Sequence, residues 1–144
     1  MSGDAKAFTA AAKLTAKKTP ALNLLGFELD AVERGRAVVR MNAGPRHRQV
    51  HGVVHGGILA ALADTASGIA AYTAVPPGTA IATVELKINY LEVVAGGRIR
   101  AEAQVLRAGR NFVVVECEIF DQNGKLAAKA LLTFGAASGH SLRT

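Results

Sequence analysis

The side chain best placed for acid–base chemistry in this sequence is that of Asp64. It is the one charged residue between His55 and Thr73, in a segment that is otherwise apolar or small. Burying an ionised carboxylate without a partner costs several kcal/mol, so such a residue needs a role that explains it. Two roles fit: a base or nucleophile that faces a substrate, or a structural acid that caps a loop or pairs with an arginine.

Helical spacing divides the segment around Asp64 into two unlike faces. Its bulky residues fall on one stripe, which we predict to be the core face: Ile58, Leu59, Leu62 and Ile69. On the other stripe Asp64 stands among residues with almost no side chain: Gly57, Ala61 and Gly68. We therefore expect a partner helix, a second backbone or a ligand to approach Asp64 along this channel of small residues.

The composition indicates one globular domain with an excess of positive charge. Of 144 residues, 50% are hydrophobic and 19% are charged, which allows one full core in a chain too short for two. The net charge of +6 favours an anionic partner. With no Trp, two Tyr and five Phe, the chain lacks the exposed aromatic residues of a nucleic-acid-binding protein. A phosphate-rich small molecule such as coenzyme A fits the charge instead.

The sequence predicts neither a secretion signal nor a membrane segment. Its first residues lack a basic stretch followed by an apolar one, and no uninterrupted apolar run reaches membrane length. We therefore expect a cytoplasmic protein. The single cysteine, Cys117, cannot form an internal disulfide and alternates with Val115 and Ile119, as a buried strand residue would.

The elements that must position Asp64 follow from the hydrophobic period. A short helix is predicted from Asp4 to Lys18 and a long one around Asp64, and period-two alternation dominates after the breaker at residues 76–78. The expected strands are 27–33, 36–41, 84–89, 98–105, 112–120 and 126–134. This order predicts an α+β fold, in which an antiparallel sheet with one buried face curls around the long helix.

At this point the chain resembles a known family. The carrying motifs are His55-Gly56-Gly57 followed by Leu62-Ala63-Asp64-Thr65, then Val84-Glu85-Leu86-Lys87-Ile88-Asn89-Tyr90-Leu91, Gly97, Gly109-Arg110 and Asp121-Gln122-Asn123-Gly124-Lys125. They resemble the hotdog-fold acyl-CoA thioesterases, in particular the PaaI-like and 4-hydroxybenzoyl-CoA thioesterase subgroup. The resemblance runs from about Leu25 to Phe134. Together with the sequence pattern, it divides the chain into a helical extension (1–20), a single hotdog thioesterase domain (21–136) and a flexible tail (137–144).

The resemblance assigns catalytic roles to five residues. Asp64 matches the family's base or nucleophile, and Gly56 matches the position whose backbone N–H polarises the thioester carbonyl. Gln49 is expected to orient water or hold the thioester, with a loop amide bonded to backbone as its alternative. Thr83 aligns with a family Ser or Thr near the attacking water, with an exposed edge residue as its alternative. His55 is expected to hydrogen-bond near the start of the helix.

The substrate-binding residues are expected on the same grounds. Gly57 and Gly68 belong to the small-residue channel, and the turn after the strand 98–105 supplies the candidate coenzyme A contacts: Arg107, Gly109, Arg110 and Asn111, with Lys125 a weaker candidate. The implied reaction hydrolyses an aryl, arylacetyl or medium-chain acyl-CoA. Coenzyme A enters as part of the substrate, and no other cofactor is expected.

His47, His51 and His55 recur at intervals of four, as metal-binding histidines on one helix do. The segment that contains them includes Gly44 and Pro45, which disfavour a helix there. We therefore predict no metal site, and we expect His47 and His51 to line or shape the entrance to the active site.

The spacing of two residues predicts the assembly. Gly56 and Asp64 are eight residues apart on one helix, so they lie about 12 Å from each other and cannot both contact one carbonyl. If both act on the same thioester, they come from different chains, and a two-fold homodimer supplies two such sites. The resemblance also implies dimers, and often dimers of dimers.

Two other functions remain open from the sequence. One is an acyl-CoA-binding module without catalytic activity on the same fold, for which Asp64 has no evident use. The other is a hotdog hydratase or dehydratase with a histidine base, although those enzymes carry different motifs around the central helix.

Overall fold

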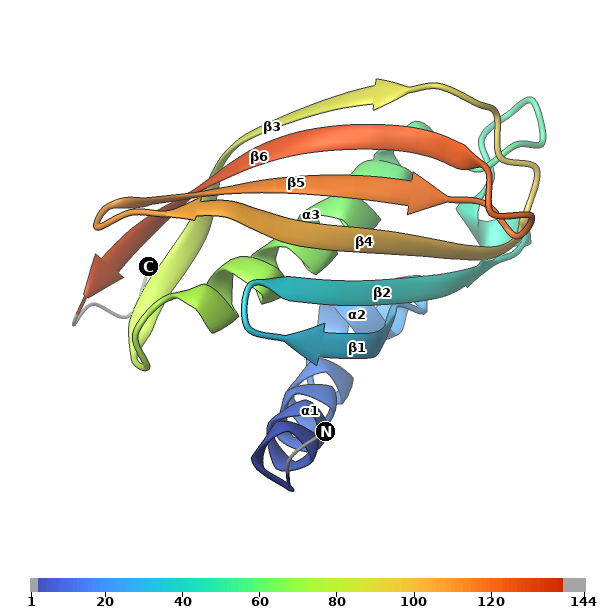
Figure 1. The fold of residues 1–144 in the computed structure, drawn as a ribbon. Coiled ribbons are helices and arrows are strands. Elements are labelled where there is room, and N and C mark those ends of the chain that lie inside the picture. The colour runs from blue at the N-terminus through green and yellow to red at the C-terminus, as the bar shows by residue number, and fades with distance from the viewer. Residues whose placement is uncertain (1–2, 139–144) are drawn as a thin grey trace.

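The longest helix of the chain, α3 (Gly56–Ala74), lies inside a curved antiparallel sheet (Figure 1). The computed structural model describes residues 3–138. The six strands are β1 (Glu28–Glu33), β2 (Arg36–Ala43), β3 (Thr79–Tyr90), β4 (Gly97–Ala108), β5 (Phe112–Phe120) and β6 (Leu126–Ser138), and they pair in the order β1-β2-β4-β5-β6-β3. The predicted α+β arrangement of a sheet around a central helix is confirmed.

The face of α3 that meets the sheet is made mostly of small residues. It is buried at Leu59, Leu62, Ala63, Ala66, Ser67, Ala70 and Ala71. Ile58 and Ile69, which were also predicted for this face, are half-buried and pack against the margin of the core. The strands carry the larger core side chains, such as Ile99, Ile119 and Leu132. Small residues on the helix let its backbone approach the sheet closely, and the large side chains of the strands fill the core between them.

The last strand is longer than its sequence pattern predicts. β6 continues to Ser138, where Ala137 and Ser138 pair with Ala80 and Thr79 of β3. The prediction that the tail is loose from residue 137 is therefore wrong for these two residues, and residues 139–144 lie outside the described part of the chain. Antiparallel pairing with β3 supplies backbone hydrogen bonds whatever the side chains are, which the alternation of hydrophobic residues does not reveal.

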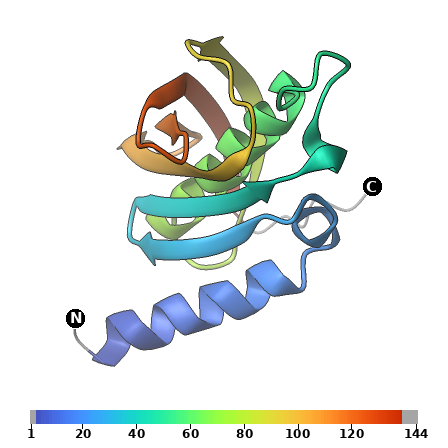
Figure 2. The ribbon, with the colours of Figure 1, turned by 90° about the vertical axis from the view of Figure 1, so that its right-hand side faces the viewer.

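The predicted helical extension is formed by α1 (Gly3–Lys17) and a short second helix, α2 (Pro20–Leu25). In Figure 2, α1 runs alongside β1 at the edge of the sheet. The hydroxyl of Thr9 donates a hydrogen bond to the carbonyl of Val32 at 3.2 Å, which ties the helix to this strand. Across residues 3–138, the helices all fall short of the length and hydropathy that crossing a membrane requires.

The loop between β2 and α3 is held by a buried histidine. His47 is 3% exposed; its Nδ1 accepts from the Gly44 N–H at 3.0 Å, and its Nε2 lies 2.8 Å from the Leu25 carbonyl, to which it donates. Its own carbonyl accepts from the His55 N–H at 2.8 Å. The prediction that His47 lines the entrance is therefore wrong, because both ring nitrogens are used to fix the loop.

We predict that His47→Ala lowers the free energy of unfolding by about 2–4 kcal/mol, because it removes two hydrogen bonds of a buried side chain and leaves two half-buried backbone groups without a partner. His51→Ala is the matched control: His51 is exposed in the same loop, and its replacement should change the stability by less than about 0.5 kcal/mol. Urea denaturation at one protein concentration measures both. Equal stabilities of the two variants would contradict the structural role of His47.

Cys117 is fully buried on the inner face of β5, as the sequence predicts. Burial raises the pKa of its thiol to about 12. Because the thiolate is the reactive form, the folded protein should be inert towards thiol reagents near neutral pH.

We expect no reaction of the native protein with a chromogenic disulfide reagent, and one equivalent per chain after denaturation, since the sequence has 1 Cys. Absorbance measured before and after addition of guanidinium tests this. Rapid labelling of the folded protein would show that Cys117 is accessible. An inert thiol also means that such a reagent can report coenzyme A release without interference from the protein.

Candidate active site

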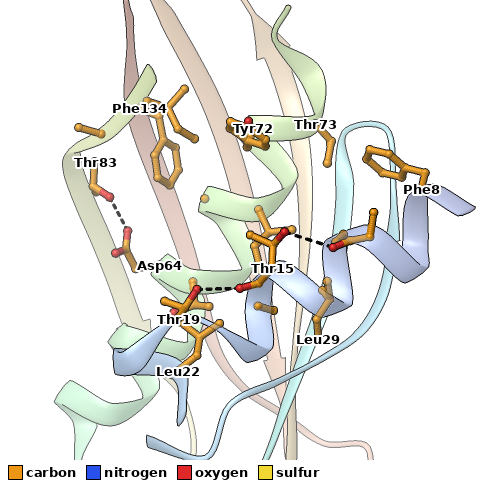
Figure 3. Close-up of a pocket in the computed structure, with 18 residues that line it drawn as sticks. Phe8, Thr15, Thr19, Leu22, Leu29, Asp64, Tyr72, Thr73, Thr83 and Phe134 are labelled. Atoms are coloured by element: carbon orange, nitrogen blue, oxygen red, sulfur yellow. Dashed lines mark hydrogen bonds between the residues drawn. The ribbon is translucent and has the colours of Figure 1, made fainter. Parts of the chain in front are cut away.

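Asp64 lies at the middle of α3 on the side that faces away from the core, and its side chain is half-buried. Its Oδ1 accepts a hydrogen bond of 2.7 Å from the Thr83 hydroxyl, which reaches across from β3 (Figure 3). Among the described residues, neither an arginine nor a loop N–H is bonded to this carboxylate. Within residues 3–138, Asp64 therefore neither caps a loop nor pairs with an arginine, which were the structural roles that the sequence left open.

An irregularity in β3 accompanies the contact between Thr83 and Asp64. The pairing of β3 with β6 shifts register between Thr83 and Glu85, so Val84 forms a bulge on the edge strand. Bulges bend a strand locally and change the direction of the side chains beside them. The bulge lies where β3 must direct a hydroxyl towards α3 rather than continue a regular alternation.

Asp64 and Thr83 lie in the wall of a cavity of about 740 Å³, a volume suited to a small-molecule ligand. The cavity is bounded by α1, α3 and β3, with Leu29 of β1 and Phe134 of β6 (Figure 3). Gly68, one of the predicted substrate-binding residues, lines it together with Asp64. Apart from Asp64, every residue in the wall is uncharged.

The start of α3 leaves one backbone donor free. His55 is the N-cap, and its Nδ1 accepts from the Gly57 N–H at 2.8 Å, which confirms its predicted place at the helix start. The His55 carbonyl accepts from the N–H groups of Ile58 (2.9 Å) and Leu59 (3.3 Å). Within the described part of the chain, the Gly56 N–H is the donor of the first turn that has no partner. It points out of the positive end of the helix dipole, where a developing negative charge is stabilised.

Tyr90, which sequence reasoning did not single out, holds Gly56 in place. Its hydroxyl donates to the Gly56 carbonyl at 2.7 Å, and burial raises its pKa. A Cβ atom at Gly56 would lie 3.1 Å from the Tyr90 ring, so the glycine allows this close approach. In the sequence, the one indication of this role was that Tyr90 directly follows the predicted strand 84–89, in a motif on which the family resemblance partly rests.

Gly56 and Asp64 do not meet within one chain. Gly56 lines a second cavity, of about 330 Å³, together with Tyr90, Leu59 and the segment 91–94 that follows β3. Asp64 lines the larger cavity and not this one. The structure therefore places the two groups in separate cavities along α3, as their spacing predicts.

Two other predicted residues use their polar groups locally. The Gln49 side-chain oxygen accepts from the His51 N–H, which is the loop-amide alternative, while its role towards a substrate stays a prediction. The Gly57 N–H is taken by the His55 cap, and a Cβ there would lie 2.9 Å from the His55 ring. Gly57 thus serves the cap. No three His, Cys, Asp or Glu side chains in the described residues lie together as a metal site would require.

The candidate coenzyme A contacts lie at the opposite end of the molecule from Gly56. Arg107 and Arg110 are exposed in the β4–β5 turn, which closes through a 2.8 Å bond from the Gly109 N–H to the Phe112 carbonyl. In Figure 1 this turn is at the end of the sheet towards which α3 runs. Two hydrogen bonds also place the end of α3 near this turn. The Thr73 hydroxyl, in the last turn of α3, accepts from the Gly35 N–H (2.8 Å), and the Gly35 carbonyl accepts from the N–H of Val105 in β4 (2.8 Å).

Within one chain, the β4–β5 turn is therefore not brought together with Gly56. The fourth predicted contact, Asn111, is exposed in the same turn, and its backbone carbonyl accepts from the Ala136 N–H at 2.8 Å. The weaker candidate Lys125 forms an ion pair of 3.0 Å with Glu92.

Comparison with known proteins identifies the family. The model of the thioesterase superfamily matches residues 51–128. A putative esterase of Saccharolobus solfataricus is 43% identical over 100 residues, which cover 69% of this chain and 71% of that protein. A 1,4-dihydroxy-2-naphthoyl-CoA hydrolase of Listeria monocytogenes is 31% identical over 102 residues, covering 71% of this chain and 83% of that protein.

A solved structure extends the likeness to almost the whole fold. The PaaI protein from the E. coli phenylacetic acid degradation operon matches with a TM-score of 0.83 and 26% identity, over 94% of this chain and 96% of that chain. The segment matched by the family model contains Gly56, Asp64 and Thr83. The chain belongs to the thioesterase superfamily, and it is a hotdog-fold hydrolase of thioester bonds.

Proposed function

We propose that this protein hydrolyses acyl-CoA thioesters in the cytoplasm at a site shared between two chains. The observation that carries the proposal is the pairing of a carboxylate held by one hydroxyl in an uncharged cavity with a helix start that keeps one N–H free. Thioester hydrolysis needs a group that activates water or attacks directly, and a donor for the carbonyl oxygen as negative charge builds on it. Asp64 and Gly56 match these two needs.

In the proposed reaction, Asp64 either removes a proton from a water that attacks the thioester carbon or attacks that carbon itself. The Thr83 hydroxyl occupies Oδ1 of the carboxylate, so Oδ2 remains for the reacting group. The carbonyl oxygen becomes negatively charged and accepts a hydrogen bond from the Gly56 N–H. When the carbon–sulfur bond breaks, the thiolate leaves as coenzyme A, and hydrolysis yields the free acid.

A histidine-based hydratase mechanism has less support. In the described structure, the Nδ1 of His55 is bonded to the Gly57 N–H, and both ring nitrogens of His47 are bonded to backbone. Neither His47 nor His55 lines the cavity that contains Asp64, so neither ring is placed to act as a base there.

The edge of the sheet supports assembly as a two-fold dimer. β3 is an edge strand of 12 residues, and unpaired backbone along such an edge invites a second strand. Large apolar side chains are exposed on it and just beyond it: Val84 62%, Tyr90 49%, Leu91 52% and Val93 73%. Covering them with a second copy would remove this apolar surface from water.

The dimer also fits the position of the catalytic groups. If two α3 helices cross antiparallel about an axis near Ala60, Gly56 of one chain lies opposite Asp64 of the other. The C-terminal end of α3, and the β4–β5 turn at the same end of the molecule, then lie beyond the Gly56 of the second chain. We therefore expect the phosphates of the coenzyme to contact this turn, at Arg107, Gly109, Arg110 and Asn111. A dimer of dimers remains part of the proposal.

Asp64→Asn keeps the shape of the side chain and removes its basicity, so we expect kcat to fall by a factor of about 100 or more with the fold intact. Release of free thiol from a panel of acyl-CoAs measures turnover, and a protein that only binds acyl-CoA would release none. Unchanged turnover would remove Asp64 from the mechanism. A single turnover in heavy-oxygen water separates its two roles, because label in the Asp64 carboxylate requires direct attack.

The shared site can be tested by mixing two inactive chains. Gly56→Pro removes the N–H at the first helical position, where proline is tolerated, and His55 already has an extended backbone. Gly56→Ala retains the N–H and adds a Cβ, so it controls for crowding against Tyr90. Heterodimers of Gly56→Pro with Asp64→Asn contain one intact site if sites are shared, and should recover about half of wild-type activity. If each chain holds its own site, the heterodimer stays inactive.

A further inference from the structure

We propose that α1 forms the outer wall of the acyl-binding cavity, and that Phe8 sets the longest acyl chain that fits. The preferred substrates are then unsubstituted, elongated acyl thioesters rather than hydroxylated aryl ones. This inference rests on the proposed function, since it takes the cavity that contains Asp64 as the acyl site. It gives a purpose to a helix that lies outside the segment 51–128 matched by the family model.

One face of α1 is directed at the cavity. The residues that line it from this side are Phe8, Ala11, Ala12, Thr15, Ala16 and Thr19, the last just after the helix. Their spacing of three and four residues places them on one helical stripe. Leu14 lies off this stripe and is 60% exposed. The apolar side of α1, which is weak as a core face, therefore lines the cavity beside its contact with β1.

The cavity extends along α3. Asp64 and Thr83 lie at one end in Figure 3, and Phe8, Tyr72 and Thr73 lie towards the other. Along α3, Asp64 and Thr73 are nine residues apart, or about 13 Å. A thioester carbonyl at Asp64 would therefore extend its acyl group along the groove between α1 and α3, towards Phe8.

The threonines in the wall do not make the cavity polar. The hydroxyls of Thr15, Thr19, Thr65 and Thr73 each donate to a backbone carbonyl of their own segment, at 3.2, 3.2, 2.8 and 2.7 Å. The hydroxyl of Thr83 is used by Asp64. These hydroxyls have used their one proton and keep only acceptor capacity, so a hydroxylated acyl group would find fewer partners than in water, whereas an alkyl chain loses nothing on entering.

The wall is also unevenly filled along its length. Ala12 and Ala16 line the cavity between Phe8 and Thr19 along α1, where their small side chains leave room for the acyl group. Phe8 is the one bulky residue that α1 contributes, and it stands at the end. A large residue placed at Ala12 would block the groove halfway, and a small one placed at Phe8 would lengthen it.

Three variants of the full chain test this with a homologous series of saturated straight-chain acyl-CoAs. Phe8→Ala should move the optimum of kcat/KM to longer chains and raise kcat/KM for the longest by about tenfold or more. Ala12→Phe should lower kcat/KM for medium chains by about tenfold while leaving the shortest unchanged. Leu14→Ala, off the stripe, should keep the wild-type profile. A hydroxybenzoyl-CoA should be a poorer substrate than an alkyl one of similar size.

A readout without turnover separates this inference from the proposed function. Saturated fatty acids of increasing length should raise the Tm of the wild type up to one length, and that limit should be longer in Phe8→Ala. Wild-type hydrolysis with chain-length profiles and acid-binding limits unaffected by Phe8→Ala would overturn the role of α1. Length-dependent binding without hydrolysis of any acyl-CoA would overturn the proposed function and keep the role of α1. If Ala12→Phe does not fold, Phe8→Ala decides, because Phe8 is at the rim and 45% exposed.

Discussion

The site depends on how closely α3 approaches the sheet. Alanine and serine on its core face let the helix backbone settle against the large side chains of the strands, and this fixes the depth and rotation of the whole helix. That rotation presents Asp64 to a cavity rather than to the core. It also places the Asp64 carboxylate 2.7 Å from a hydroxyl of β3. β3 lies at the opposite edge of the sheet from β1 and β2, yet this hydroxyl reaches α3. A bulkier helix would stand off from the sheet and lose this contact.

The start of α3 shows how hydrogen bonds that stabilise a fold can also define a reactive group. His47 fixes the loop, the loop fixes His55, and His55 satisfies the N–H groups of Gly57, Ile58 and Leu59. The Gly56 N–H is the one that the cap does not reach, and Tyr90 holds its carbonyl from the other side. The donor is therefore positioned in advance, so it need not reorganise as charge develops on a substrate oxygen.

Much of the fold followed from the sequence because its period signals were strong. Six strands, the long helix and the cap at His55 were predicted near their observed places. The errors share a cause. Ile58 and Ile69 were expected on the core face by their spacing and size, but they pack only against its margin, because the residues that fit closely against the sheet are smaller. His47 was assigned to the entrance by its type, but three backbone contacts, with Gly44, Leu25 and His55, make it structural. The end of β6 depends on pairing with β3, which no local pattern contains.

By itself the sequence determined that Asp64 stands alone on an apolar helix and that Gly56 is too far along that helix to share a substrate with it, because helix geometry fixes both facts. Only the tertiary structure decided that the Thr83 hydroxyl bonds directly to Asp64, that the cap leaves the Gly56 N–H without a partner in the described residues, and that α1 folds back to face the cavity. Those properties depend on contacts between segments far apart in the chain, such as Thr83 with Asp64 and Tyr90 with Gly56. Packing of the whole core sets such contacts, and residue types and spacing do not encode them locally.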